Sequence, residues 1–141
     1  MHALELIHGL LSPAGELIDI HPLGERPLFE VRGPNGCYPC GYLLETDDGI
    51  EYPQATAALL QAVQNGWFKQ LESATFRFTT HADSPDELFK YLEQQWSDAV
   101  LLPEVIAKVE KHFAEAGPRV EVRLTETVTI SRFIVNNHCF Q

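Results

Sequence analysis

The chain has 141 residues, of which 45% are hydrophobic, and this length and apolar content predict one folded domain over residues 1–141 with a flexible tail at 136–141. Its formal net charge is −10, with 10 basic residues scattered among 20 acidic ones, which argues against binding to nucleic acid or to an anionic membrane surface. The sequence has no apolar run of about 20 residues and no signal-like start, so we expect a cytoplasmic protein without a membrane span.

The first third of the chain predicts a helix, a buried strand and a hairpin. Residues 1–11 carry leucine and isoleucine at helical spacing, and the apolar run Glu16–Ile20 is typical of a strand. Asn35-Gly36 is a strong hairpin signal because both residues tolerate a positive φ. We therefore expect a hairpin over residues 28–45, followed by a second turn at Asp47–Gly49.

The middle of the chain predicts a helix followed by a strand. Apolar residues recur at helical spacing over residues 53–65. Residues 68–80 then alternate in character as a strand does, with Phe76 and Phe78 on one face. We expect these two rings in the core, and the lining of an apolar pocket is the alternative.

The last third predicts two helices and a long strand. Ser84, followed by Pro85 and Glu87, has the signature of a helix start, in which Ser84 caps and Glu87 reaches back to the cap amide. A second helix is expected over residues 103–116. The final apolar alternation is interrupted by Glu126, which predicts a bulge or bend in that strand. Together the elements predict an α/β fold, α+β by layout, with helices packed on a small mixed sheet and an inserted β-hairpin.

The segment Leu10–Pro22, with the sequence LLSPAGELIDIHP, resembles the passage into the fifth strand of class I S-adenosylmethionine-dependent methyltransferases. The resemblance extends over residues 3–134 and is closest to small-molecule members of that family. It implies the C-terminal half of a Rossmann-like methyltransferase fold. In that fold the last strand would run antiparallel between the strands at 16–20 and 68–80.

The resemblance also says what the chain lacks. In the family, a first strand, a glycine-rich loop and an acidic residue after the second strand hold the cofactor. The sequence contains no G-x-G motif, so we expect no cofactor and assign no cofactor-binding residue. The implied function is a methyltransferase-like binding module that is not catalytic alone. The alternative is a subunit that completes a split methyltransferase.

The strand at residues 16–20 predicts a contact with another chain. If the strands that precede it in the family are absent, one of its edges is bare, and bare edges recruit partners. We therefore expect a homodimer or a partner subunit bound through the edge of residues 16–20.

Two histidines are candidates for binding a small molecule. His21 and His81 each end a predicted strand, and open α/β folds bind ligands at the carboxyl ends of their parallel strands. Glu25 near His21 and Asp83 near His81 would supply acid–base partners. The alternative is that each histidine bonds a turn and that Asp83 helps to cap the following helix.

Cys37 and Cys40 form the chain's C-x-x-C pair. The pair follows a hairpin turn rather than a helix start, so we expect two structural thiols and assign no metal. The alternative is a zinc- or thiol-dependent protein in which His138 supplies a further ligand.

Overall fold

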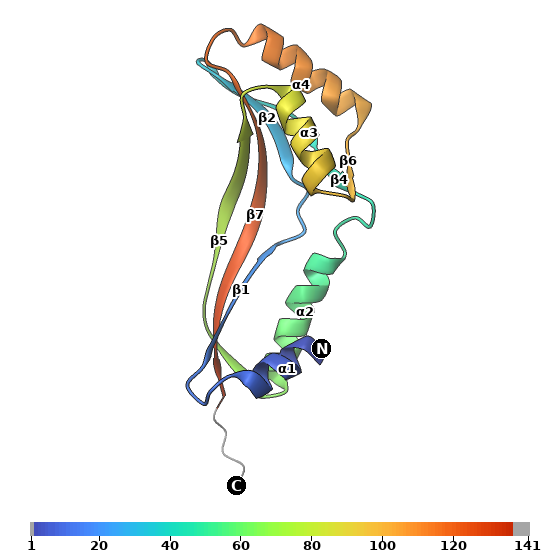
Figure 1. The fold of residues 1–141 in the computed structure, drawn as a ribbon. Coiled ribbons are helices and arrows are strands. Elements are labelled where there is room, and N and C mark those ends of the chain that lie inside the picture. Colours follow the sequence, from blue (N-terminus) through green and yellow to red (C-terminus); the bar gives the residue numbers. More distant parts are fainter. Residues whose placement is uncertain (1, 137–141) are drawn as a thin grey trace. The chain divides into compact units, whose positions relative to one another are not determined.

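The structure, a computed structural model, describes residues 2–136 and divides them into two compact units (Figure 1). Unit 1 contains the chain up to Gly24, Ile50–Phe76 and the chain from Val128, and unit 2 contains Glu25–Gly49 and Arg77–Thr127. The strands β5 (Phe68–Ala82) and β7 (Glu121–Val135) contribute to both units. No helix among residues 2–136 is both long and apolar enough to cross a bilayer.

Unit 1 is built on three strands, with β7 in the middle. Its other elements are α1 (His2–Leu10), β1 (Glu16–Pro22) and α2 (Glu51–Gln64). β1 pairs antiparallel with β7, from Glu16 opposite Ile134 to Pro22 opposite Val128. β5 also pairs with β7, so β7 lies between the two strands, which is the strand order that the resemblance implied.

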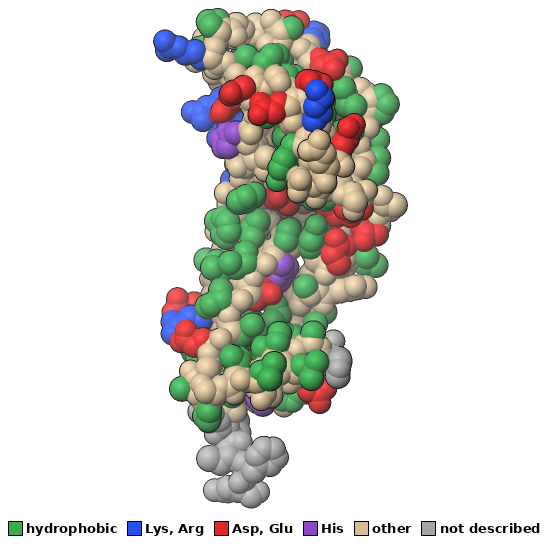
Figure 2. Space-filling model, in the orientation of Figure 1, with side chains coloured by type: hydrophobic (Ala, Val, Ile, Leu, Met, Phe, Trp, Pro, Cys, Tyr) green, Lys and Arg blue, Asp and Glu red, His purple; other side chains and the backbone are tan. Residues whose placement is uncertain are grey.

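The core of unit 1 joins both helices to one face of the sheet. Its buried members are Leu59, Ala62, Phe68, Phe133 and Val135. Leucine and isoleucine side chains of α1 pack against this cluster, and the ring of His8 meets Phe68 edge-on at 5.4 Å. The outer side of α1 exposes Leu6 and Leu10, and hydrophobic side chains cover much of that surface in Figure 2.

Phe76 does not enter this core, so the expectation of a buried ring is wrong at this position. Its side chain is 42% exposed. The adjacent Thr75 lines a cavity beneath α2, and neighbouring side chains of a strand point to opposite faces. Phe76 therefore lies on the face of β5 that the two helices leave uncovered.

Unit 2 packs two helices on an antiparallel sheet. Both units combine helices with strands, which confirms the predicted α/β fold. The remaining elements of unit 2 are β2 (Leu28–Gly33), β3 (Gly36–Tyr42), β4 (Leu44–Glu45), α3 (Pro85–Gln95), β6 (Ala99–Val100) and α4 (Pro103–Glu115). β2 pairs antiparallel with β7 and β3, and the turn from Gly33 to Gly36 closes the predicted hairpin. β4 and β6 form a separate two-stranded sheet.

The core of unit 2 lies between its sheet and its helices. Phe29 and Val31 of β2 are fully buried, and Leu88 of α3 and Val109 of α4 pack into the same cluster. The start of α3 follows its sequence signature, because the amide of Glu87 donates to Ser84 Oγ at 3.2 Å. The carboxylate of Glu87 accepts from the amide of Asp83, one residue before the cap.

One prediction about the long strands of unit 2 needs correction, and the bulge or bend at Glu126 stays a prediction. Phe78 is 53% exposed rather than buried, because α3 covers β5 near Ala82. Phe78 instead lines a cavity of about 310 Å³ with Tyr91 of α3, which was the alternative expectation. Near Glu126, β7 continues as a strand, and its pairing with β2 ends one residue earlier, at Thr125.

Candidate functional site

A cavity of about 390 Å³ in unit 1 is lined by both apolar and polar side chains. We call it the hydroxyl cavity. Its apolar lining comes from Leu23, Leu59, Leu60 and Phe133. Its polar lining consists of hydroxyl, amide and imidazole groups, which come from His21, Thr56, Gln70, Ser73, Thr75, Thr129 and Ser131. Among residues 2–136, no lysine, arginine, aspartate or glutamate lines it.

The sheet supplies a floor of hydroxyl groups because β5 and β7 place serine and threonine side by side. Ser73 Oγ lies 3.0 Å from Ser131 Oγ, and Thr129 Oγ1 donates to the carbonyl of Ala74 at 3.4 Å. Thr129 and Ser131 are buried. Within residues 2–136 no side-chain hydrogen bond involves Thr75 or Gln70, so both groups remain available to a ligand.

His21 lies at the edge of this floor in a chain of three side chains. Its Nδ1 contacts Asp19 Oδ2 at 2.5 Å, and its Nε2 contacts Thr56 Oγ1 at 2.9 Å. Asp19 and His21 share one face of β1 because they are two residues apart. Thr56, in the first half of α2, also approaches the carbonyl of Tyr52 at 3.3 Å. The carboxylate thus fixes the ring so that Nε2 faces the threonine hydroxyl.

The chain from Asp19 to Thr56 has two proton arrangements that satisfy it. If the imidazole is neutral with its proton on Nδ1, the hydroxyl of Thr56 donates to Nε2. If the imidazole is protonated, Nε2 donates to Thr56 Oγ1, and that hydroxyl donates to the carbonyl of Tyr52. In both arrangements the hydroxyl proton of Thr56 is used within the protein, so its oxygen can serve a ligand only as an acceptor.

The structure separates the candidate residues predicted from the sequence. His21 lines the hydroxyl cavity, but its carboxylate partner is Asp19, while Glu25 belongs to unit 2. In unit 2, His81 Nδ1 contacts Glu121 at 3.2 Å, and Asp83 lies at the turn before α3. Asp19 was missed although its position two residues before His21 on a strand is itself a signal of proximity.

The thiols of Cys37 and Cys40 lie in different surroundings on β3. Cys37 is exposed, and Cys40 is buried in the core of unit 2. Cys40 Sγ lies 3.4 Å from the carbonyl of Tyr38, and burial raises the pKa of this thiol. A shared metal requires both sulfur atoms to face one ion, and the predicted third ligand, His138, falls outside the described residues.

His21 lines the hydroxyl cavity and contacts both a carboxylate and a hydroxyl group, whereas His81 lines the cavity of about 310 Å³ in unit 2 and, within residues 2–136, contacts only the carboxylate of Glu121. No protein-family model, no curated protein and no solved structure matches this chain.

Proposed function

We propose that unit 1 is a binding module for a small uncharged molecule with one apolar end and one hydrogen-bonding end. The combination of leucine and phenylalanine side chains with a row of hydroxyl groups in one cavity lining carries this proposal. Small-molecule sites are lined mainly by apolar groups with a few placed polar groups, and they occupy about 300–1,000 Å³. The cavity's volume of about 390 Å³ falls in that range.

The choice of an uncharged ligand follows from the lining. A bound anion would find no lysine or arginine in the hydroxyl cavity, and a bound cation would find no carboxylate lining it, since Asp19 is engaged by His21. Removing an unpaired charge from water is unfavourable by on the order of several kcal/mol. Hydroxyl and amide groups satisfy a neutral ligand without that penalty.

Benzamide tests this proposal, because its ring suits the leucine side chains of the lining and its amide suits the hydroxyl groups. Benzoate and benzylammonium serve as anionic and cationic analogues of similar shape. We expect benzamide to produce saturable shifts in a ¹H–¹⁵N NMR titration at the amides of Ser73, Thr75, Thr129 and Ser131. The two charged analogues are expected to bind at least about tenfold more weakly, the effect of 1.4 kcal/mol.

Variants locate the effect in unit 1. His21→Ala and Ser131→Ala should each weaken benzamide binding by about threefold to tenfold, the effect of losing one hydrogen bond. His81→Ala is the matched control, because this histidine also contacts a carboxylate but lies in unit 2. Equal binding of all three probes, or equal losses in the His21 and His81 variants, would contradict the proposal.

A second candidate function rests on the outer edge of β1. One edge of β1 pairs with β7, and within residues 2–136 no strand pairs with the other. On the adjoining face Ile18 and Ile20 are 51% and 59% exposed. Bare apolar edges favour strand addition from a partner. We infer that a subunit completing a split S-adenosylmethionine-dependent methyltransferase would bind here.

A strand from a different chain fits this edge better than a second copy. Two copies of β1 paired antiparallel about their midpoint would place Asp19 opposite Asp19, and the net charge of −10 adds repulsion. We expect a monomer in sedimentation velocity across the micromolar range. Gain of S-adenosylmethionine binding on mixing with a methyltransferase half that ends after its fourth strand would support this role. A stable homodimer that Ile20→Lys dissociates would contradict it.

A further inference from the structure

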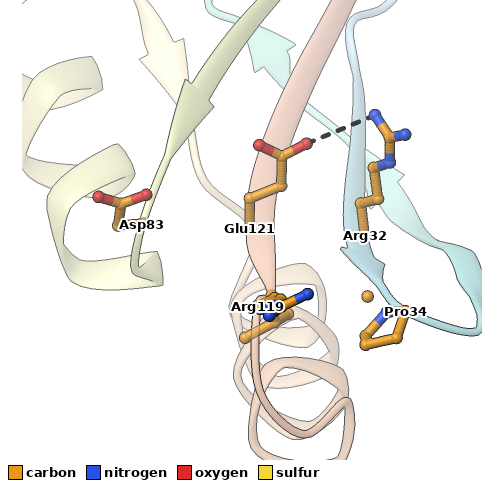
Figure 3. A pocket seen from close by; sticks show the side chains of 7 residues that line it. Arg32, Pro34, Asp83, Arg119 and Glu121 are labelled. Carbon is orange, nitrogen blue, oxygen red and sulfur yellow. Dashed lines mark ion pairs between the residues drawn. The ribbon is translucent and has the colours of Figure 1, made fainter.

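Another cavity of unit 2, of about 410 Å³, is lined by four charged side chains. We call it the charged cavity. Arg32 comes from the end of β2, Asp83 from the turn before α3, and Arg119 and Glu121 from the chain entering β7. Figure 3 shows Asp83 on one side of Glu121 and Arg32 on the other, with Arg119 below them.

The middle of the charged cavity is an ion-pair network around Glu121. Arg32 Nη1 lies 3.8 Å from Glu121 Oε1, and Arg123 Nε lies 3.4 Å from the same oxygen. His81 Nδ1 approaches the other carboxylate oxygen at 3.2 Å. Two guanidinium groups therefore share one carboxylate, which leaves positive charge on the Arg32 side of the cavity.

Arg119 and Asp83, the other two charged residues of the lining, take no part in the ion pairs around Glu121. Within residues 2–136, neither Arg119 nor the carboxylate of Asp83 takes part in an ion pair. Both are exposed to solvent and line the same cavity. The charged cavity thus offers a free guanidinium and a free carboxylate to any ligand that enters it.

The backbone at Arg119 supports a specific placement of its side chain. Its φ is +60°, in the left-handed region that residues other than glycine, asparagine and aspartate seldom adopt. Such a conformation is unfavourable by about 1 kcal/mol and persists where the surroundings demand it. Here it directs the chain from Gly117-Pro118 into β7 and sets Arg119 at the cavity.

We propose that the charged cavity binds a small amino-carboxylate zwitterion. The ligand's carboxylate would contact Arg119 and Arg32, and its ammonium group would contact Asp83. A plain anion is disfavoured because Asp83 and Glu121 line the same space, and a plain cation is disfavoured by the two arginines. Pro34 and Val120 supply apolar surface for the ligand's carbon chain.

Four probes test this inference on the unaltered chain. L-Leucine and 6-aminohexanoate are zwitterions with short and long charge separations, and hexanoate and hexylamine each carry one of the two charges. Affinities come from NMR titrations that follow the amides of Gly33, Val120 and Glu121. We expect at least one zwitterion to bind at least about tenfold more tightly than both single-charge probes, as two charge-assisted contacts predict.

Charge-removing variants then assign each contact. Asp83→Asn should lower zwitterion affinity at least about fivefold without weakening hexanoate, and Arg119→Asn should lower zwitterion affinity similarly without weakening hexylamine. Asparagine is chosen at position 119 because it tolerates the left-handed backbone. Arg26→Gln removes an exposed arginine of unit 2 that pairs with Asp48 outside the cavity, and it should leave all affinities unchanged.

Each alternative result overturns the inference in a recognisable way. Hexanoate binding as tightly as both zwitterions would show a simple anion site. Affinities of all four probes within a factor of about two, in the unaltered chain, would show that the cavity selects no ligand. Neither result bears on the hydroxyl cavity of unit 1, because that cavity shares no residue with this one.

Discussion

Glu126 is a partly buried carboxylate whose surroundings favour its protonated form. Burial raises its pKa above the ordinary value of 4.5, so the folded chain holds this proton more tightly than the unfolded chain does. The free energy of unfolding should therefore fall as pH rises above 4.5 and stop falling above the folded-state pKa. Glu126→Gln should remove that fall and raise the free energy of unfolding at pH 7.

Urea unfolding of both chains near pH 4 and pH 7 measures this difference directly. The substituted chain should gain on the unaltered chain only at the higher pH. A Glu126→Gln chain that is less stable at pH 7, or that keeps the full pH dependence, would show that the carboxylate is not destabilising there.

Gly41 is a residue that cannot take a side chain. Its φ is +127°, and an added Cβ would lie 2.7 Å from Val105 Cγ2 on α4. Gly36 has a similar φ of +134°, but nothing lies within 4 Å of the position of its Cβ. Gly41→Ala should therefore destabilise the fold by about 2–4 kcal/mol and Gly36→Ala by about 1–2 kcal/mol.

Both alanine variants strain the backbone, but only Gly41→Ala also brings a Cβ against Val105. Comparing the two variants therefore separates backbone strain from crowding. Chemical denaturation gives the two free energies of unfolding. Equal losses at the two positions would mean that the packing of α4 on β3 contributes nothing at Gly41.

At the scale of single elements, α3 depends on its N-cap residue, Ser84. Ser84 Oγ accepts from the amide of Glu87 and so satisfies one of the free donors of the first turn. Ser84→Ala should lower the free energy of unfolding by about 1 kcal/mol, and Ser84→Asp should restore most of it. Thermal unfolding followed by circular dichroism measures both, and an unchanged midpoint for Ser84→Ala would contradict the capping role.

The strand β3 should make its two thiols react at different rates. Cys37 is exposed, whereas Cys40 is buried and its thiol pKa is raised by that burial. Iodoacetamide should alkylate Cys37 in the native chain and reach Cys40 only after unfolding. Peptide mass spectrometry distinguishes the two sites. Equal rates in the native chain would contradict the position of Cys40 in the core.

Elements defined by neighbouring residues were predictable from the sequence, and those defined by distant contacts were not. The helix start at Ser84 and the hairpin turn between Gly33 and Gly36 are local, because their hydrogen bonds or φ values involve a few adjacent residues. The turn itself is made by Pro34 and Asn35, so Asn35-Gly36 marked the hairpin without forming its two central residues. The exposure of Phe76 depends on which sheet face the helices cover, and alternation along β5 carries no information about that choice.

At the scale of the whole molecule, the division into two units has no signal in the sequence. The unit boundaries fall inside β5 and β7, between Phe76 and Arg77 and between Thr127 and Val128. Composition marks a domain boundary only where it produces a linker, and no linker interrupts these strands. Each unit has its own cluster of buried residues, one around Phe68 and the other around Phe29, and the expectation of one domain over residues 1–141 stays a prediction.

The candidate site was predictable in one residue and not in its surroundings. His21 was identified because it ends a strand. The hydroxyl floor is drawn from β5 and β7, which are about 55 residues apart in the chain but adjacent in the sheet, as the bond from Thr129 to the carbonyl of Ala74 shows. Such a floor is visible only once strand pairing is known, because each strand alone shows ordinary alternation of polar residues.

The most direct test of a ligand site in unit 1 is to locate benzamide on the protein. Intermolecular nuclear Overhauser effects between its ring protons and leucine methyl groups report contact, with Leu59 and Leu60 of the hydroxyl cavity as targets and Leu88 and Leu92 of unit 2 as internal controls. A ligand site in unit 1 predicts contacts to Leu59 and Leu60 that weaken in His21→Ala at subsaturating benzamide, and none to Leu88 or Leu92. Contacts confined to the unit 2 leucines, or none at saturating benzamide, would contradict a binding site in unit 1.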